Sequence, residues 1–118
     1  MSNEIMLIAQ FEIDEGKIDE FKELYNQGIE LVKQSEPDIS YFSLYINQDE
    51  TVVCSVEMYR DSQAILKHFE YSSERIPKIL EICRVTNVEV YGNVTDEVKE
   101  LLSPYGTKFY NYSIAYQR

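Results

Sequence analysis

The sequence predicts an α+β fold in which helices cover one face of an antiparallel sheet. Alternating β-rich runs and helical runs of period three to four follow one another in the order strand, helix, strand, strand, helix, strand. That order is the split βαβ pattern of a ferredoxin-like sheet. The strands also carry apolar side chains on both faces, so one layer of helices leaves a second apolar face to be covered.

The first half of the chain supplies one strand, one helix and a hairpin. Residues 4–12 alternate as a strand whose two faces are both largely apolar. Residues 18–34 repeat apolar side chains at steps of three and four, which predicts a long amphipathic helix that ends near Pro37. Residues 39–47 and 51–59 are β-rich runs joined by a short polar link, and we expect them to form an antiparallel hairpin.

The second half begins with two helical pieces and a strand. Asp61 or Ser62 can cap a helix over residues 63–70, and a second helical piece is expected over residues 75–84. Residues 86–93 predict the next strand.

The remaining residues predict a short helix and a fifth strand. The helix starts with a capped, acidic first turn at Thr95 and stops at residues 104–106. Residues 108–116 alternate closely enough to be a strand on a sheet edge, either in this copy or in a partner. We expect one domain over residues 1–118, with a core at about 4–92 and an extension at about 93–118.

Charge and composition restrict the partners. With 21 acidic and 11 basic side chains, the net charge of −10 repels phosphate backbones and anionic lipid heads, so we expect no nucleic acid and no membrane partner. The apolar N-terminal stretch is too short to span a bilayer, and a cytoplasmic location is expected. Cys54 and Cys83 lie among apolar residues and predict two reduced, buried thiols. The apolar second face of the sheet predicts a homodimer paired through that face.

The segment VVCSVEMYRDSQAILKHFE resembles the central stretch of the antibiotic-biosynthesis-monooxygenase-like family of dimeric α/β barrels. It has a strand that holds Glu57 and ends in Tyr59, then Asp61, then Ala64 and His68 on the next helix. The runs GKIDEFKEL and SEPDISYFSLY also resemble that family, and the resemblance covers roughly residues 4–92.

The resemblance implies a homodimer whose two sheets form a common barrel, with a pocket in each subunit between sheet and helices. Some relatives oxidise quinols or polyketide aromatics with molecular oxygen and without metal or flavin, and others break down haem. Haem-degrading relatives carry a Trp on the second helix and a His on the following helical piece. This chain has no Trp, His68 lies at about the position of that Trp, and residues 72–83 contain no His, which leaves a Tyr or Cys ligand open.

His68 and Glu57 are the candidate catalytic residues. His68 is the single histidine and lies on the helix stripe expected to face the sheet, where its imidazole can accept a phenolic proton. The alternative for His68 is a buried ring bonded to a carbonyl or a carboxylate. Glu57 can orient His68, act as a base or form a salt bridge at the rim, and the salt bridge is the favoured alternative.

Further residues are candidates for ligand binding. Gln10, Tyr41, Tyr45 and Tyr59 can surround an aromatic ligand, although such residues also serve as core or interface packing. One His and no clustered Cys do not make the usual zinc or di-iron site, and no phosphate-binding glycine pattern or nucleophile elbow occurs. We expect no metal and no cofactor.

Two function hypotheses follow. The first is a cofactor-independent monooxygenase that acts on a small electron-rich aromatic such as a quinol, with His68 as base. The second is a non-catalytic dimer that binds an aromatic ligand or a protein, or a haem-binding relative.

Overall fold

A computed structural model describes residues 3–116 and 118. The described residues form a five-stranded sheet in the order β2-β3-β1-β4-β5. Four strands pair antiparallel, and the short β5 runs parallel to β4 at the edge. The strands are β1 (Ile5–Ile13), β2 (Ile39–Ile46), β3 (Val52–Tyr59), β4 (Cys83–Tyr91) and β5 (Lys108–Tyr110).

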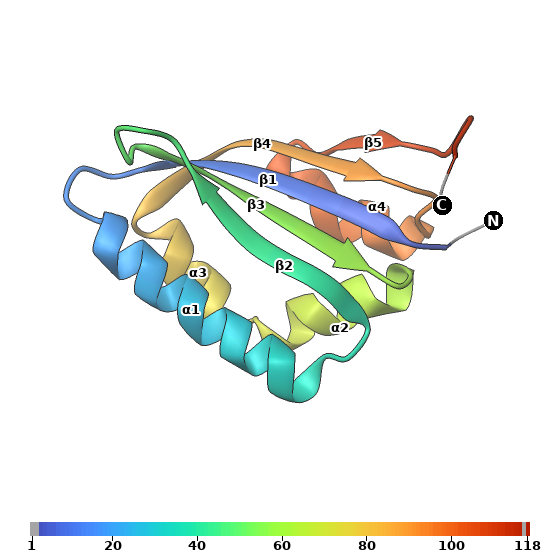
Figure 1. The fold of residues 1–118 in the computed structure, drawn as a ribbon, viewed down its shortest axis with the longest axis horizontal. Helices are drawn as coiled ribbons and strands as arrows, with labels where there is room; N and C mark the ends of the chain where they lie inside the picture. Colours follow the sequence, from blue (N-terminus) through green and yellow to red (C-terminus); the bar gives the residue numbers. More distant parts are fainter. Residues whose placement is uncertain (1–2, 117) are drawn as a thin grey trace.

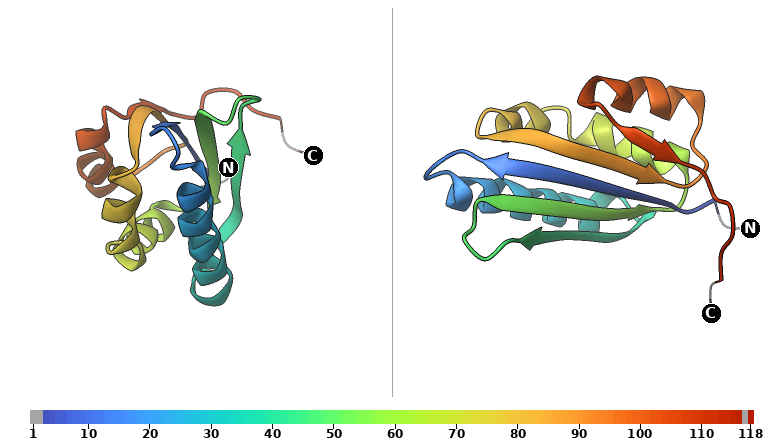
Figure 2. Two further views of the ribbon diagram at one scale, coloured as in Figure 1. Left: turned by 90° about the vertical axis from the view of Figure 1, so that its left-hand side faces the viewer. Right: turned by 90° about the horizontal axis from the view of Figure 1, so that it is seen from above.

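The helices pack against one face of this sheet, as Figures 1 and 2 show. Within the described residues they are α1 (Ile18–Ser35), α2 (Ser62–Tyr71), α3 (Arg75–Leu80), α4 (Asp96–Leu102) and a 3₁₀ turn (Ser103–Tyr105). No helix in this part of the chain is long and apolar enough to cross a membrane. The predicted α+β, ferredoxin-like fold is confirmed, with the C-terminal helix and strand added at the β4 edge.

Helix starts follow the capping residues that the sequence offered. The Asp61 carboxylate accepts a hydrogen bond from the Ala64 backbone N–H at 3.0 Å and starts α2. Thr95 caps α4 through the Val98 N–H in the same way. Because the Asp61 cap fixes where α2 begins, it also fixes which residues of α2 turn toward the sheet.

Three boundaries differ from the sequence prediction. The helical piece expected over residues 75–84 ends at Leu80, and β4 begins at Cys83 because Cys83 pairs with Ile13 of β1. Pairing with a central strand outweighs the local helical pattern there. The fifth strand ends at Tyr110 instead of reaching residue 116. One exposure also differs: Leu31, an apolar residue within the helix predicted over residues 18–34, is 45 % exposed on α1.

The two faces of the sheet have different surroundings. On the helix side, residues such as Ile5, Leu7 and Val90 are buried against the helices. On the open side, Met6, Ile8, Val56 and Met58 are half-buried, and four tyrosines are exposed: Tyr41, Tyr45, Tyr91 and Tyr110. The second apolar face that the strand pattern predicted is therefore present.

Candidate functional site

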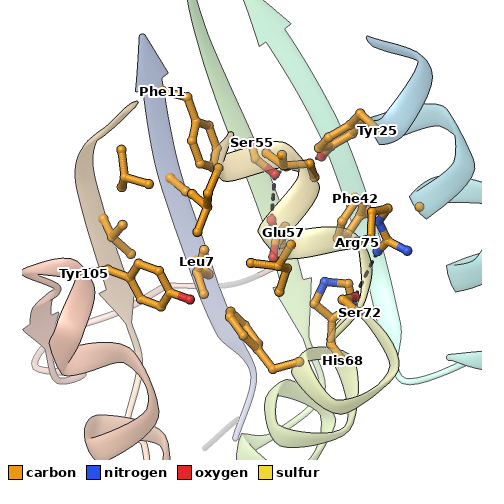
Figure 3. Close-up of a pocket in the computed structure, with 18 of the residues that line it drawn as sticks. Leu7, Phe11, Tyr25, Phe42, Ser55, Glu57, His68, Ser72, Arg75 and Tyr105 are labelled. Carbon is orange, nitrogen blue, oxygen red and sulfur yellow. Dashed lines mark hydrogen bonds between the residues drawn. The ribbon is translucent and has the colours of Figure 1, made fainter. Parts of the chain in front are cut away.

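A cavity of about 110 Å³ lies between the helix side of the sheet and the helices. Figure 3 shows side chains from β1, β3, α1 and the α2–α3 region converging on it. Most of the lining is apolar, and polar groups come from few positions: Tyr25, Ser55, Glu57, His68, Ser72, Arg75 and Tyr105. A mainly apolar cavity with a few convergent polar groups is the usual form of a small-molecule site.

His68 is held by a carboxylate at the end of another helix. Its Nδ1 lies 3.0 Å from Oε1 of Glu36, which follows the last residue of α1. Both side chains are buried, with 5 % and 4 % exposure. Because a carboxylate only accepts hydrogen bonds, we assign the ring proton to Nδ1, which leaves Nε2 as the acceptor of the neutral ring.

Nε2 of His68 is the nitrogen open to a ligand. It has no hydrogen bond within the described residues. In this part of the chain every fully buried side-chain nitrogen or oxygen has a hydrogen-bond partner, so Nε2 is not fully buried. Nε2 therefore borders open space, and His68 lines the cavity. Aromatic rings pack around the imidazole, with centroid distances of 5.2 Å to Phe42 and 5.8 Å to both Tyr59 and Phe69.

Glu57 belongs to a second group of polar side chains on the buried face of β3. Its carboxylate accepts hydrogen bonds from the Ser55 hydroxyl at 2.6 Å and the Tyr59 hydroxyl at 2.5 Å. The Tyr25 hydroxyl lies 2.8 Å from Ser55 Oγ. Since the single Ser55 proton goes to Glu57, Tyr25 must donate to Ser55. The protons of this network therefore all point toward the Glu57 carboxylate.

Burial keeps the two tyrosines of this network protonated. Desolvation raises the pKa of Tyr25, and the Glu57 charge raises it further. Desolvation also raises the pKa of Tyr59 well above its usual value, with the same added effect of Glu57. Both phenols therefore remain hydrogen-bond donors throughout the neutral range.

Arg75, the first residue of α3, brings a guanidinium to the same cavity. Its side chain is half-buried, and Nη2 donates a hydrogen bond to Ser72 Oγ at 2.9 Å. Desolvation lowers the pKa of Arg75, an effect opposed by the charges of Glu36 and Glu57. The cavity thus combines a held imidazole, a carboxylate and a guanidinium.

The family model of antibiotic biosynthesis monooxygenases matches residues 4–72, more than half of the chain. The chain belongs to the antibiotic biosynthesis monooxygenase family. The match covers β1 to α2 and therefore includes Glu36, Glu57 and His68. No curated protein matches the sequence.

Solved structures share the fold of this family member at low sequence identity. MupZ from Pseudomonas fluorescens is 24 % identical, with a TM-score of 0.89 over 99 % of this chain and 96 % of its own. SnoaB, described as a cofactor-independent oxygenase from Streptomyces nogalater, is 10 % identical, with a TM-score of 0.67 over 80 % of this chain and 96 % of its own. A conserved protein from Methanosarcina mazei is 19 % identical, with a TM-score of 0.64 over 74 % of this chain and 87 % of its own.

Two expectations about Glu57 are corrected. The favoured salt bridge at the rim is absent among the described residues, because the Glu57 carboxylate points inward to Ser55 and Tyr59. Glu57 also does not orient His68, since the His68 ring is bonded to Glu36. Both Glu57 and His68 nevertheless line the cavity, and for His68 this is the side of the helix that the sequence predicted to face the sheet.

The expected ligand-binding residues divide between the two faces of the sheet. Gln10, Tyr41 and Tyr45 do not line this cavity: Gln10 pairs with Cys54 and Asn87 on the open face, where the two tyrosine hydroxyls bond each other. Successive side chains of a strand point to opposite faces of the sheet, so these three residues point away from the helices while their neighbours in each strand point toward them. Tyr59 is fully buried and acts on the site through Glu57 and the His68 ring, without lining the cavity itself.

Sequence reasoning missed Glu36, Arg75, Ser55 and Tyr25. Nothing local in the sequence marks Glu36 as buried. A usable signal existed for the network around Glu57: Ser55 lies two residues away on the same strand face, and Tyr25, which bonds Ser55, lies on the apolar stripe of α1. Among the described residues no three His, Cys, Asp or Glu side chains gather as a metal site.

Proposed function

We propose that this protein is a cofactor-independent monooxygenase that acts on a small electron-rich phenol or quinol, with His68 as the general base. The observation that carries the proposal is the Glu36–His68 pair, which fixes the ring and turns Nε2 to an apolar cavity. Membership of the monooxygenase family and the shared fold of SnoaB support the same reaction class.

Proton transfer to His68 starts the reaction. Nε2 accepts the proton of a substrate hydroxyl, and the Glu36 carboxylate balances the positive charge that the ring acquires. The resulting phenolate passes electrons to oxygen far more readily than the neutral phenol. With hydroquinone as substrate, C₆H₆O₂ and O₂ give a hydroxyquinone, C₆H₄O₃, and H₂O, so one oxygen atom stays on the ring and the other leaves as water.

Glu57 has an electrostatic part in this proposal. Its carboxylate lines the cavity and is held by Ser55 and Tyr59. A fixed negative charge raises the energy of a nearby phenolate more than that of the neutral radical left after electron loss. Glu57 therefore favours electron transfer to oxygen once His68 has removed the proton.

The partner that we infer for the open face of the sheet is a second copy of this chain. Half-buried Ile8, Val56 and Met58 on that face are apolar side chains that one subunit leaves uncovered. Members of the family pair through this face, and an apolar face of this kind is costly to leave in water. The cavity lies on the opposite side of the sheet, so pairing leaves the helix side free.

Oxygen uptake tests the catalytic proposal. Purified protein is mixed with a panel of hydroquinones, and His68→Ala is compared with Glu70→Gln, an exposed change on the same helix. We expect uptake by the wild type and by Glu70→Gln, and a fall of about 100-fold or more for His68→Ala. Equal rates for His68→Ala and wild type would remove His68 from the mechanism.

The second candidate function is binding of a small aromatic ligand without turnover. It is favoured by the closed network of Tyr25, Ser55, Glu57 and Tyr59, whose polar groups are satisfied without a substrate. Saturable binding of a hydroquinone without oxygen uptake would favour this candidate, and uptake would exclude it.

A further inference from the structure

The position of Arg75 depends on a glycine in the facing helix. Its guanidinium lies against Gly28 of α1, and a Cβ on Gly28 would come within 2.9 Å of Nε and 3.0 Å of both Cζ and Nη2. Gly28 is not among the glycines with positive φ, so its backbone does not require glycine. Glycine inside a helix is less stable than alanine. A Cβ at this position would displace the guanidinium, a shift that the end of a flexible arginine side chain can make, so Gly28 leaves the room in which the guanidinium now lies.

Most hydrogen-bonding capacity of Arg75 is unused. A guanidinium has five N–H donors, and this one donates to Ser72 Oγ alone, with no carboxylate within 4.0 Å among the described residues. The surface arginines differ: Arg60 pairs with Asp38 at 3.0 Å, and Arg84 pairs with Glu12 at 2.7 Å. Arg75 is thus a half-buried cation whose remaining donors are available to a ligand.

The charges around the cavity give a bound ligand one orientation. The side chains of Glu57, Glu36 and His68 are buried, whereas Arg75 is half-exposed at the start of α3. The two carboxylates repel an anion, so an anionic group can bind only in direct contact with Arg75, with the neutral end of the ligand directed inward. Figure 3 shows Arg75 and His68 on the same side of the cavity, with Ser72 between them.

The spacing of these groups suits one aromatic ring. Ser72, which holds Arg75, follows His68 by four residues, and such positions on a helix are about 5–6 Å apart. The cavity of about 110 Å³ is smaller than one of about 150 Å³ that holds benzene, so it has room for one ring at most and leaves a substituent on that ring to the half-exposed side where Arg75 lies. A ring with a hydroxyl at His68 would present its far side to Arg75.

We propose that the substrate is a small aromatic acid, a phenol or quinol whose carboxylate is bound by the Arg75 guanidinium. The guanidinium itself lies in the space that Gly28 leaves on α1. This inference rests on the proposed function for the reaction, but the anion preference is measurable without turnover. Paired N–H donors on a planar cation match a carboxylate in two parallel hydrogen bonds.

Three ligands test the preference in the wild-type protein. Gentisate (2,5-dihydroxybenzoate), its methyl ester and hydroquinone share the quinol ring, and only gentisate carries a negative charge near pH 7. Binding is measured by calorimetry under argon, so that no oxidation takes place. We expect gentisate to bind at least about tenfold more tightly than either neutral ligand. Equal affinities, or no binding of gentisate at millimolar concentration, would overturn the proposal.

Variants then assign the preference to Arg75. Arg75→Gln should abolish it, while Arg84→Gln, a surface arginine on the open face, should leave it intact. Gly28→Ala keeps the charge but displaces the guanidinium, so it should weaken gentisate binding, with no further loss when combined with Arg75→Gln. A preference that survives in Arg75→Gln would overturn the assignment.

The two proposals fail in different ways. If gentisate binds preferentially through Arg75 but no quinol supports oxygen uptake, the proposed function is wrong and the anion site stands. If hydroquinone and methyl gentisate are oxygenated while gentisate shows no tighter binding, the reaction stands and the assignment of Arg75 is wrong.

Discussion

His68 and Glu36 are 32 positions apart in the chain, and their hydrogen bond joins the end of α1 to the last turn of α2. The bond decides which nitrogen of the ring carries the proton and limits rotation of the imidazole. A base whose accepting nitrogen is fixed in direction needs little reorganisation when the substrate arrives.

Replacing Glu36 by Gln tests this pair directly. The Gln oxygen can still accept the Nδ1 proton, but it does not balance the charge of a protonated ring. We expect kcat to fall by about tenfold or more, with KM changed little, and the pH profile of kcat to move. Glu70→Gln, an exposed change of the same chemistry, serves as the control. An unchanged kcat in Glu36→Gln would show that the pair is only structural.

The buried phenols predict a loss of stability at alkaline pH. The pKa values of Tyr25 and Tyr59 are raised in the folded protein, so above about pH 10 the unfolded chain releases protons that the folded chain keeps. The free energy of unfolding must then fall with rising pH, by up to about 1.4 kcal/mol per pH unit for each phenol. Below about pH 10 this contribution is constant.

Urea unfolding from pH 8 to 11.5 measures the slope. The thiol of Cys83 adds to the fall from about pH 9, because burial raises its pKa to about 11. Tyr25→Phe should make the slope shallower, whereas Val98→Ala, a buried change without a titrating group, should lower the stability equally at every pH. An identical slope in Tyr25→Phe and wild type would contradict the assignment.

At the scale of elements, α2 is the one that positions the base. The Asp61 cap sets its first turn, and His68 lies in its last. Asp61→Ala should lower the free energy of unfolding by about 1 kcal/mol, while Asp61→Asn, which can still cap, should lower it by much less. Chemical denaturation of the two variants provides the measurement. Equal losses would show that the charge of Asp61 matters and not its cap.

The elements themselves were largely predictable, because side-chain period and capping residues are local properties. β1, the hairpin, α1 and α2 appear close to their expected bounds. The start of β4 at Cys83 was not predictable in this way, since its pairing with Ile13 depends on a contact 70 residues away in the chain.

The site was predictable only in part, for the same reason. The sheet-facing side of His68 follows from the helix period, so His68 was placed correctly at the cavity, whereas Glu57 was expected at the rim and lines the cavity instead. Their partners were not predictable, because the meeting of Glu36 with His68 depends on how the end of α1 packs against α2. Gln10 was misplaced because both faces of β1 are apolar, and the pattern alone does not tell which face the helices cover.

At the scale of the whole molecule, pairing through the open face of the sheet is the prediction to test. Ile8→Glu puts a charge in the centre of that face and should shift the protein from dimer to monomer in sedimentation experiments. Leu31→Glu, on the exposed side of α1, is the matched control and should leave the mass unchanged. A monomeric wild type would contradict the dimer, and a dimer broken by Leu31→Glu alone would place the interface at α1.

The fate of molecular oxygen tests the central claim, oxygenation of a quinol in the cavity beneath His68, most directly. Hydroquinone is incubated with the protein under ¹⁸O₂, and the product is analysed by mass spectrometry. We expect a hydroxyquinone with one labelled oxygen atom per molecule, formed by the wild type and lost in His68→Ala. A product without label, or equal labelling with His68→Ala, would contradict it.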